Sequence, residues 1–414
     1  MENITLHNGD SAEVLKQYPD NHFDSVVTDP PYGIEFLGKD WDSNTGAIEV
    51  WQECLRVLKP GGYMLAFSAA RTYHRLAVNL EDVGFEIKDQ IMWLYGSGFP
   101  KAQDIGKKSG NDEWAGWKTG LKPAHEPIVM CRKPLDNKMG KRGPMKSRLS
   151  VVENVEKWGV GALNIDDTRI EFTDNINLNN KLPSANNQFK NKNWVAEDGK
   201  VEKLEPIQEY NPQGRFPSNV IISEEVGKEL DEKIGNKKFG NKKGGYKYDK
   251  TYNVEGFINN NKPDAPSNYG DGGGVSKYFY SPKVNRKERH NGLFEDSKDI
   301  PIMFAGDEGG GANAVNIRNN ITGYSDLDKY GGEEIKTSKD NTLGNNHPTV
   351  KPVALMNYLV TLITPPNGKV LDPFNGSGST GMAVKEFGGE YTGIDLDENY
   401  IEISRKRIDA WDNK

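Results

Sequence analysis

Short apolar runs alternate with amphipathic stretches along the first third of the chain. Residues 23–32 (FDSVVTDPPY) start with aromatic and β-branched residues and end in two prolines, which predicts a buried strand that stops at a turn. Residues 47–58 repeat apolar side chains at helical spacing. Residues 59–62 (KPGG) predict a turn, and residues 63–68 and 85–96 predict two more strands. Strands that alternate with helices indicate an α/β sheet.

The same alternation returns at the end of the chain. Residues 352–363 predict a helix that begins with proline, a residue suited to the first helical turn. A short strand at 370–371 is followed by a glycine-rich turn and a helix. Residues 390–395 predict another strand, and residues 398–411 predict a closing helix.

The middle of the chain, residues 134–346, has a different character. Residues 171–200 contain eight Asn and residues 234–276 contain nine Gly, with almost no sustained apolar period. Only residues 215–223 and 275–283 have the composition of strands. We interpret 134–346 as an insertion with little regular structure between an ordered unit at 1–133 and a second one at 347–414.

Composition limits the partners and the cellular setting. The 414 residues carry a formal charge of −7, so contact with an anionic partner requires a local basic patch. Two cysteines far apart in sequence, Cys54 and Cys131, exclude a disulfide scaffold and a zinc ribbon. The polar N-terminus predicts no signal peptide, and the longest apolar run is too short to span a bilayer. We therefore expect a soluble cytoplasmic protein with no membrane partner.

The glycine turn at residues 376–381 matches G-x-G-x-x-G between a strand and a helix. Such turns let the backbone approach a ligand, and Asp395, at the end of the next strand, is placed to accept hydrogen bonds from ribose hydroxyls. This indicates an adenosine-containing cofactor; the alternative is a tight turn without a ligand. Only 19 residues follow Asp395, so the remaining strands of the sheet must come from the N-terminus. The domain is therefore predicted to be circularly permuted.

The tetrapeptide Asp29-Pro30-Pro31-Tyr32 carries the second candidate chemistry. Prolines fix the backbone and supply no N–H donor, which leaves carbonyls free beside a carboxylate. Two such acceptors suit an aromatic amino group, and they would stabilise the positive charge of methyl transfer to its nitrogen. Tyr32 can stack on a planar base. The alternative is a strand-ending turn with an incidental Asp.

Both motifs together resemble those of S-adenosylmethionine-dependent DNA amino-methyltransferases. TDPPY (residues 28–32) and LDPFNGSGSTG (371–381) resemble the catalytic and cofactor motifs, and HPTVKP (347–352), LKPGG (58–62) and Gly9-Asp10 also match. The order of the motifs is that of the permuted β class, and several further stretches are similar to its phage and prophage branch. The resemblance implies a doubly wound, Rossmann-like methyltransferase sheet with an inserted target-recognition region at 134–346.

The family resemblance also implies roles for individual residues. The target base would be held by Asp29, Pro30, Pro31 and Tyr32. The cofactor S-adenosyl-L-methionine would be lined by Asp10, His347, Pro348, Thr349, Lys351, Asp372, Pro373, Phe374, Gly376, Ser377, Gly378 and Asp395.

Basic clusters in the insertion are candidates for phosphate contacts. The candidates are Lys237, Lys238, Lys242 and Lys243, followed by Arg286, Lys287 and Arg289. A solvated loop is the alternative interpretation for both clusters. Trp93 and Tyr95 end a predicted strand, where they serve either the core or the flipped base. The six His residues show no metal-ligand spacing, so we expect no metal.

These observations predict methyl transfer to the N6 amino group of a flipped-out adenine in double-stranded DNA. Asp at the first position of the tetrapeptide is usual for adenine enzymes in this family, whereas Ser is usual for cytosine-N4 enzymes. The rival hypotheses are a cytosine-N4 enzyme, an RNA or protein amide methyltransferase, and a non-catalytic DNA-binding protein on the same fold. The resemblance also suggests a homodimer and a cognate restriction endonuclease as partners.

Overall fold

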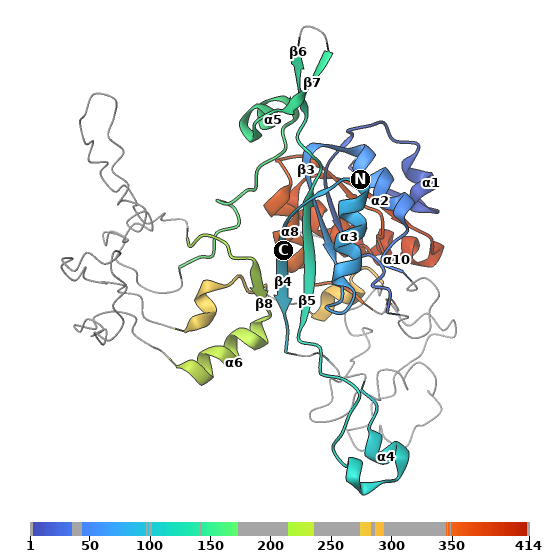
Figure 1. Cartoon of the computed structure of the whole chain (residues 1–414), viewed down its shortest axis with the longest axis vertical. Coiled ribbons are helices and arrows are strands. Elements are labelled where there is room, and N and C mark those ends of the chain that lie inside the picture. Colours follow the sequence, from blue (N-terminus) through green and yellow to red (C-terminus); the bar gives the residue numbers. More distant parts are fainter. Residues whose placement is uncertain are drawn as a thin grey trace, which may run out of the picture.

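The computed structural model describes two ordered units of the chain and parts of the segment between them (Figure 1). The described residues are 3–34, 44–96, 98, 102–140, 143–172, 214–235, 274–282, 286–293, 345, 347 and 349–411. Within these residues no helix is long and apolar enough to cross a membrane.

An eight-stranded mixed sheet forms the centre of the molecule. In spatial order its strands are β1 (Ile4–Asn8), β10 (Glu390–Asp395), β9 (Lys369–Asp372), β2 (Phe23–Thr28), β3 (Leu58–Phe67), β5 (His125–Arg132), β4 (Glu86–Leu94) and β8 (Val220–Ile222). β5 is antiparallel to both of its neighbours, and the other pairs are parallel. The two C-terminal strands lie between the N-terminal strands β1 and β2. This order confirms the predicted permuted α/β sheet.

Helices cover both faces of the sheet because its strands are apolar on both sides. Val26 packs on the face covered by α1 (Ser11–Leu15), α2 (Ile48–Val57) and α3 (Tyr73–Val83). Its neighbour Val27 packs on the opposite face with α8 (Val353–Ile363), α9 (Ser379–Phe387) and α10 (Glu398–Asp409). The sheet thus separates two buried apolar clusters, a three-layer arrangement.

The segment between the two units supplies one strand to this sheet. β8 pairs with β4 at the sheet edge. The other described elements outside the core layers are α4 (Ile105–Ser109), η3 (Asp112–Trp114), β6 (Asn137–Gly140), β7 (Gly143–Arg148), α5 (Val151–Trp158), α6 (Glu224–Ile234), η5 (Val275–Tyr278) and η6 (Arg286–His290). In Figure 1 the β6–β7 hairpin and α4 extend from opposite ends of the molecule.

Two local predictions were wrong. Residues 59–62 lie inside β3 instead of forming a separate turn, because Gly61 and Gly62 exchange backbone hydrogen bonds with Lys133 beyond β5. Residues 275–282, the described part of the predicted strand 275–283, contain the 3₁₀ helix η5 and one bridge instead of a strand. Asp231 accepts hydrogen bonds from the Ser276 amide (2.9 Å) and hydroxyl (2.5 Å), which fixes a turn there.

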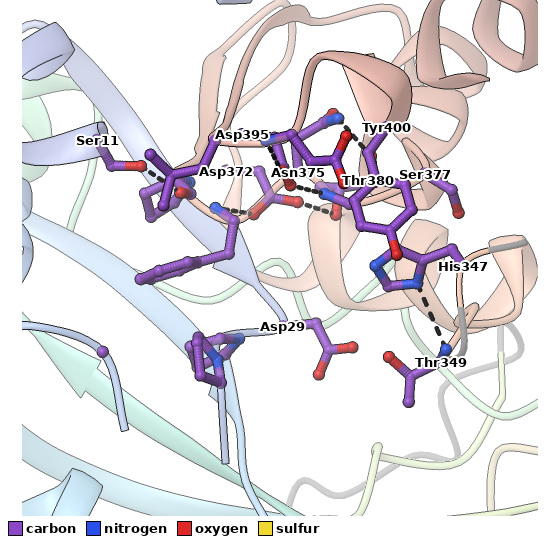
Figure 2. A pocket seen from close by; sticks show the side chains of 18 of the residues that line it. Ser11, Asp29, His347, Thr349, Asp372, Asn375, Ser377, Thr380, Asp395 and Tyr400 are labelled. Atoms are coloured by element: carbon purple, nitrogen blue, oxygen red, sulfur yellow. Dashed lines mark hydrogen bonds between the residues drawn. The ribbon is translucent and has the colours of Figure 1, made fainter. Parts of the chain in front are cut away.

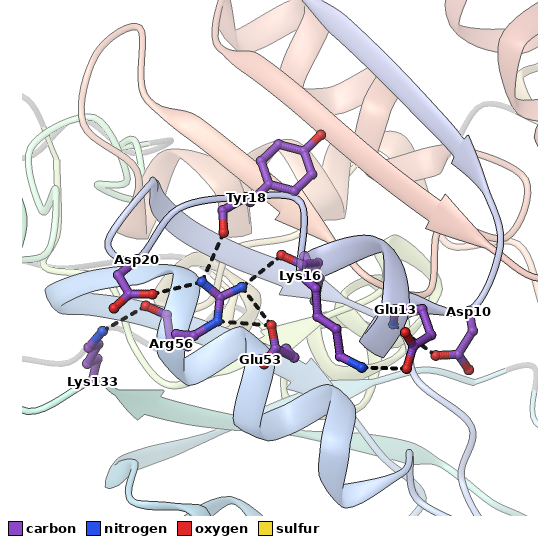
Figure 3. A network of polar contacts seen from close by, with 9 residues as sticks. Asp10, Glu13, Lys16, Tyr18, Asp20, Glu53, Arg56 and Lys133 are labelled. Atoms are coloured by element: carbon purple, nitrogen blue, oxygen red, sulfur yellow. Dashed lines mark hydrogen bonds and ion pairs between the residues drawn. The ribbon is translucent and has the colours of Figure 1, made fainter.

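Arg56 fixes the loop between α1 and β2 (Figure 3). Its guanidinium donates to the backbone carbonyls of Leu15 (2.8 Å) and Tyr18 (2.9 Å) and pairs with Glu53 on its own helix. Asp10 caps the N-terminus of α1 by accepting from the Glu13 amide, and Asp10 and Ser11 line the cavity described below, so this network supports one wall of that cavity.

Candidate active site

Four acidic side chains gather at one edge of the sheet. Asp29 directly follows β2, and one residue separates Asp10 from the end of β1. Asp372 is the last residue of β9, and Asp395 is the last residue of β10. Because these four strands are parallel, their carboxyl ends meet at the same edge. A cavity of about 460 Å³ opens there, and all four aspartates line it.

The Asp29 carboxylate is held by two polar side chains. Lys351 Nζ lies 2.5 Å from Asp29 Oδ2, and the Tyr32 hydroxyl donates to Asp29 Oδ1 at 2.8 Å. Lys351 is buried, yet the Asp29 and Glu126 carboxylates outweigh that burial and raise its pKa, so it carries a charge. Figure 2 shows the Asp29 carboxyl group pointing toward the side of the cavity where Thr349 lies.

Glu126 belongs to this cluster although the sequence did not single it out. It lies on β5, and its Oε2 accepts from the Tyr32 hydroxyl at 3.0 Å and lies 3.4 Å from Lys351 Nζ. Tyr95, at the end of β4, faces the same carboxylate; burial and Glu126 raise the pKa of Tyr95 to about 12. The only sequence signal was an acidic residue at the start of a strand that is otherwise apolar.

The glycine turn is held from both sides. Asp395 Oδ2 accepts from the Gly376 amide at 2.7 Å, and Asp395 Oδ1 accepts from the Asp397 amide at 3.0 Å. Behind the turn, the buried Arg407 donates to the carbonyl and hydroxyl of Ser377. The turn therefore has its conformation fixed by residues of β10 and α10.

The glycines of this turn allow neighbouring side chains to pack closely, as well as a ligand to approach the backbone. Gly376 (φ 51°) faces the His347 ring, which a Cβ would crowd. Gly378 (φ 82°) faces away from the cavity, and a Cβ there would overlap the Ser404 side chain of α10. Gly376 lines the cavity, but Gly378 is absent from its described lining. Gly378 therefore packs against α10, and its expected contact with a cofactor stays a prediction.

Asp372 is buried, and both of its carboxylate oxygens accept hydrogen bonds. Its oxygens accept from the hydroxyls of Thr28 and Thr380, each at 2.6 Å, and from the Phe374 amide at 3.1 Å. Burial raises the pKa of Asp372 to about 6 despite these donors. Asp372 lines the cavity and at the same time joins the end of β2 to the start of α9.

His347 and two aromatic side chains complete the lining. Burial lowers the pKa of His347 to about 4, so its ring is neutral near pH 7, and the ring packs edge-on against Tyr400. The Phe374 ring lies 5.5 Å from that of Trp51 on α2. In Figure 2 His347, Tyr400 and Thr380 are drawn on one side of the cavity and Ser11 on the other.

The charges of the lining fit S-adenosylmethionine. Five carboxylates line the cavity, and Lys351 is the one ammonium among the lining residues that the structure describes. A sulfonium cofactor with an additional ammonium group would find counter-charges here, and Asp395 retains free acceptor capacity for hydroxyls. Among the described residues no cluster of His, Cys, Asp and Glu has the geometry to hold a metal ion.

The structure brings together most of the predicted site residues. The described cavity lining contains Asp10, Asp29, Pro30, Pro31, Tyr32, His347, Thr349, Lys351, Asp372, Pro373, Phe374, Gly376, Ser377 and Asp395. Pro348, Lys237, Lys238, Lys242 and Lys243 lie outside the described residues. Arg286, Lys287 and Arg289 belong to η6, and the Arg289 guanidinium donates to the His347 carbonyl at 2.7 Å.

Trp93 and Tyr95 were predicted to serve either in the core or beside the flipped base. Their rings lie 5.2 Å apart, and Trp93 packs against the apolar cluster that contains α8. Tyr95 faces Glu126 next to Asp29. The position of Trp93 favours a core role, whereas Tyr95 lies beside the candidate catalytic cluster.

A family model described as DNA methylase, of the N6 and N4 type, matches residues 23–406. The curated relatives cover shorter parts. Type II methyltransferase M.HindIII of Haemophilus influenzae is 26% identical over 210 residues. The match covers 38% of this chain and 64% of that protein. Type II methyltransferase M.SfiI of Streptomyces fimbriatus is 31% identical over 125 residues, which are 30% of this chain and 29% of that protein. The chain thus spans less than two thirds of these relatives.

Two solved structures also match the chain. The crystal structure of M1.HpyAVI is 14% identical, covers 98% of both chains and has a TM-score of 0.40. The cytosine-N4-specific PvuII DNA methyltransferase is 12% identical, covers 98% of this chain and 86% of its own, and has a TM-score of 0.41.

The cavity predicts that Asp395 governs cofactor affinity. Asp395→Ala removes a carboxylate that can accept ribose hydroxyls and that also orders Gly376, so the Kd for S-adenosylmethionine is expected to rise about ten- to hundredfold. Isothermal titration calorimetry measures this change. The matched control Glu398→Ala removes an exposed carboxylate three residues away, outside the described lining, and should leave the Kd unchanged. Wild-type affinity in folded Asp395→Ala would place the cofactor elsewhere.

Proposed function

Because the chain belongs to the N6/N4 DNA methylase family, we propose that it transfers a methyl group from S-adenosylmethionine to the N6 amino group of adenine in DNA. The family membership confirms the predicted resemblance to DNA amino-methyltransferases. The observation that carries the finer proposal is the position of the Asp29-Pro30-Pro31-Tyr32 turn, which forms one end of the acid-lined cavity.

The turn has the acceptors that an amino group needs. The nitrogen of an aromatic amine is a poor nucleophile because its lone pair is delocalised into the ring. In this proposal the Asp29 carboxylate and the Pro30 carbonyl accept its two hydrogens, which localises the lone pair and stabilises the charge that develops on nitrogen. The bound cofactor supplies the methyl group as an electrophile. Tyr32 holds Asp29 in position and presents its ring beside the acceptors.

Adenine is proposed over cytosine because the tetrapeptide begins with Asp. A cytosine-N4 amino group has the same hydrogen-bonding pattern, so N4 methylation is the second candidate. Both amino groups lie inside the stacked duplex, and the turn lies at the edge of a sheet, where only an extruded base reaches it. We therefore include flipping of the base in the proposal.

Sequence recognition is assigned to the insertion, residues 134–346. One described part of this segment, β8, joins the sheet beside β4, and α6 follows it directly in the chain. Its lysine cluster provides positive charge that a net-acidic protein otherwise lacks. A homodimer and a companion restriction endonuclease remain proposals that rest on the type II relatives.

Asp29→Ala tests the catalytic assignment. The variant loses an acceptor that is used most strongly in the transition state, so the single-turnover methylation rate should fall at least about a hundredfold, or roughly 3 kcal/mol. Calorimetry should show nearly unchanged cofactor affinity. Asp82→Ala, which removes an exposed carboxylate on α3, serves as the control and should methylate at the wild-type rate. A near-normal rate in Asp29→Ala would refute the role of this turn.

The lysine cluster should contribute phosphate contacts. Changing Lys237, Lys238, Lys242 and Lys243 to Gln should weaken DNA binding and flatten its salt dependence by up to about 0.9 in log–log slope per lost contact. The methylated sequence should stay the same, since phosphate contacts position the protein without specifying bases. Changing Lys16 and Lys406, exposed lysines paired with glutamates, should leave the slope unchanged. An unaltered slope in the fourfold variant would indicate a solvated loop.

A further inference from the structure

Three charged side chains from distant segments meet in one cluster. Asp29 follows β2, Glu126 lies on β5 and Lys351 precedes α8. Lys351 Nζ lies 2.5 Å from Asp29 Oδ2 and 3.4 Å from Glu126 Oε2. The Tyr32 hydroxyl bridges the same two carboxylates at 2.8 and 3.0 Å, and Lys351 Nζ donates to it at 3.1 Å. Two carboxylates thus share one ammonium and one hydroxyl.

This arrangement conflicts with the role proposed for Asp29. Lys351 and Tyr32 contact both oxygens of the carboxylate that is expected to accept the target amino group. When that group binds, it competes with the ammonium for Asp29 Oδ2. The Lys351 side chain is only 6% exposed. Its ammonium therefore cannot lose the Asp29 counter-charge without a large cost in free energy. The ammonium therefore needs a second carboxylate within reach.

Glu126 is that second carboxylate. Two aromatic ring faces also lie close to the ammonium: Lys351 Nζ lies 4.9 Å from the centre of the Phe67 ring and 5.5 Å from that of Tyr32. These rings allow a small displacement but do not neutralise a charge. We propose that Glu126 is a positioning residue that holds the Lys351 ammonium while the target amino group occupies Asp29. This inference rests on the proposed function.

The charge count of the cluster gives the proposal a specific signature. Asp29, Glu126 and Lys351 together carry a net charge of −1. Glu126→Gln makes the cluster neutral and leaves Lys351 bound to Asp29 alone, so the amino group has to displace a firmly paired ammonium. Lys351→Met leaves two adjacent carboxylates that repel each other. The double variant restores −1 and leaves Asp29 Oδ2 without the ammonium, while the Tyr32 hydroxyl still donates to Asp29 Oδ1.

The experiment measures single-turnover methylation of genomic DNA from a methylase-deficient bacterium, with enzyme in excess over sites and saturating methyl-labelled S-adenosylmethionine. Glu126→Gln should lower the rate constant about tenfold, and Lys351→Met should also lower it. The double variant should react faster than either single variant. Glu81→Gln, on the exposed side of α3, should match the wild type. Calorimetry should give Glu126→Gln a wild-type cofactor Kd, since Glu126 is absent from the described cavity lining, and this binding also verifies folding.

A purely structural role for Glu126 gives a different result. The losses of the two single variants would then multiply, and a double variant slower than the slower single variant would overturn the proposal. A wild-type rate in Glu126→Gln would overturn it as well. Asp29→Ala in the same assay tests the proposed function separately, because it removes the acceptor altogether. If Asp29→Ala reacts at the wild-type rate, the proposed function fails; if it is inactive and the losses multiply, only the role of Glu126 fails.

Discussion

The buried Asp372 carboxylate fixes the geometry on which the candidate site depends. It accepts hydrogen bonds from Thr28, the residue before Asp29, and from Thr380 in the first turn of α9. One side chain thereby joins the candidate catalytic turn to the glycine turn, although the two lie more than 340 residues apart in sequence. Removing the Asp372 carboxylate would leave buried hydroxyls without an acceptor. The candidate catalytic turn and the glycine turn would also lose the side chain that joins them.

The same edge of the sheet concentrates negative charge. Parallel strands bring Asp10, Asp29, Asp372 and Asp395 together, and burial opposes ionisation of the last two by raising their pKa values. Backbone amides at Phe374, Gly376 and Asp397 offset part of that cost. A cofactor that brings a sulfonium and an ammonium would relieve the remaining repulsion. The chemical class of the ligand thus follows from charge balance as well as from motif resemblance.

Local patterns predicted the parts of the structure that depend on local physics. The strand that ends just before Asp29, the glycine turn and the helix after Pro352 each have a short-range signal. Contacts that depend on tertiary packing were not predictable. Gly378 is needed against Ser404, Arg407 supports Ser377 from another helix, and β8 joins the sheet from within the polar segment.

Glu126 illustrates the same limit within the site itself. A glutamate at the start of an apolar strand is usually solvated, and only the approach of Lys351 and Tyr32 from other segments makes it part of the cluster. Arg289 was predicted from a basic run as a phosphate contact. In the structure its guanidinium donates to the His347 carbonyl beside the cavity. In both cases the side chain's partners, more than its own type, decide what it can do.

The proposed activity of this chain is methylation of the N6 amino group of adenine in DNA. The most direct test incubates the purified protein with unmethylated bacterial DNA and S-adenosylmethionine bearing a deuterated methyl group, digests the DNA to nucleosides and analyses them by mass spectrometry. The account predicts labelled N6-methyladenine. Label found only in N4-methylcytosine, or in no base at all, would contradict it.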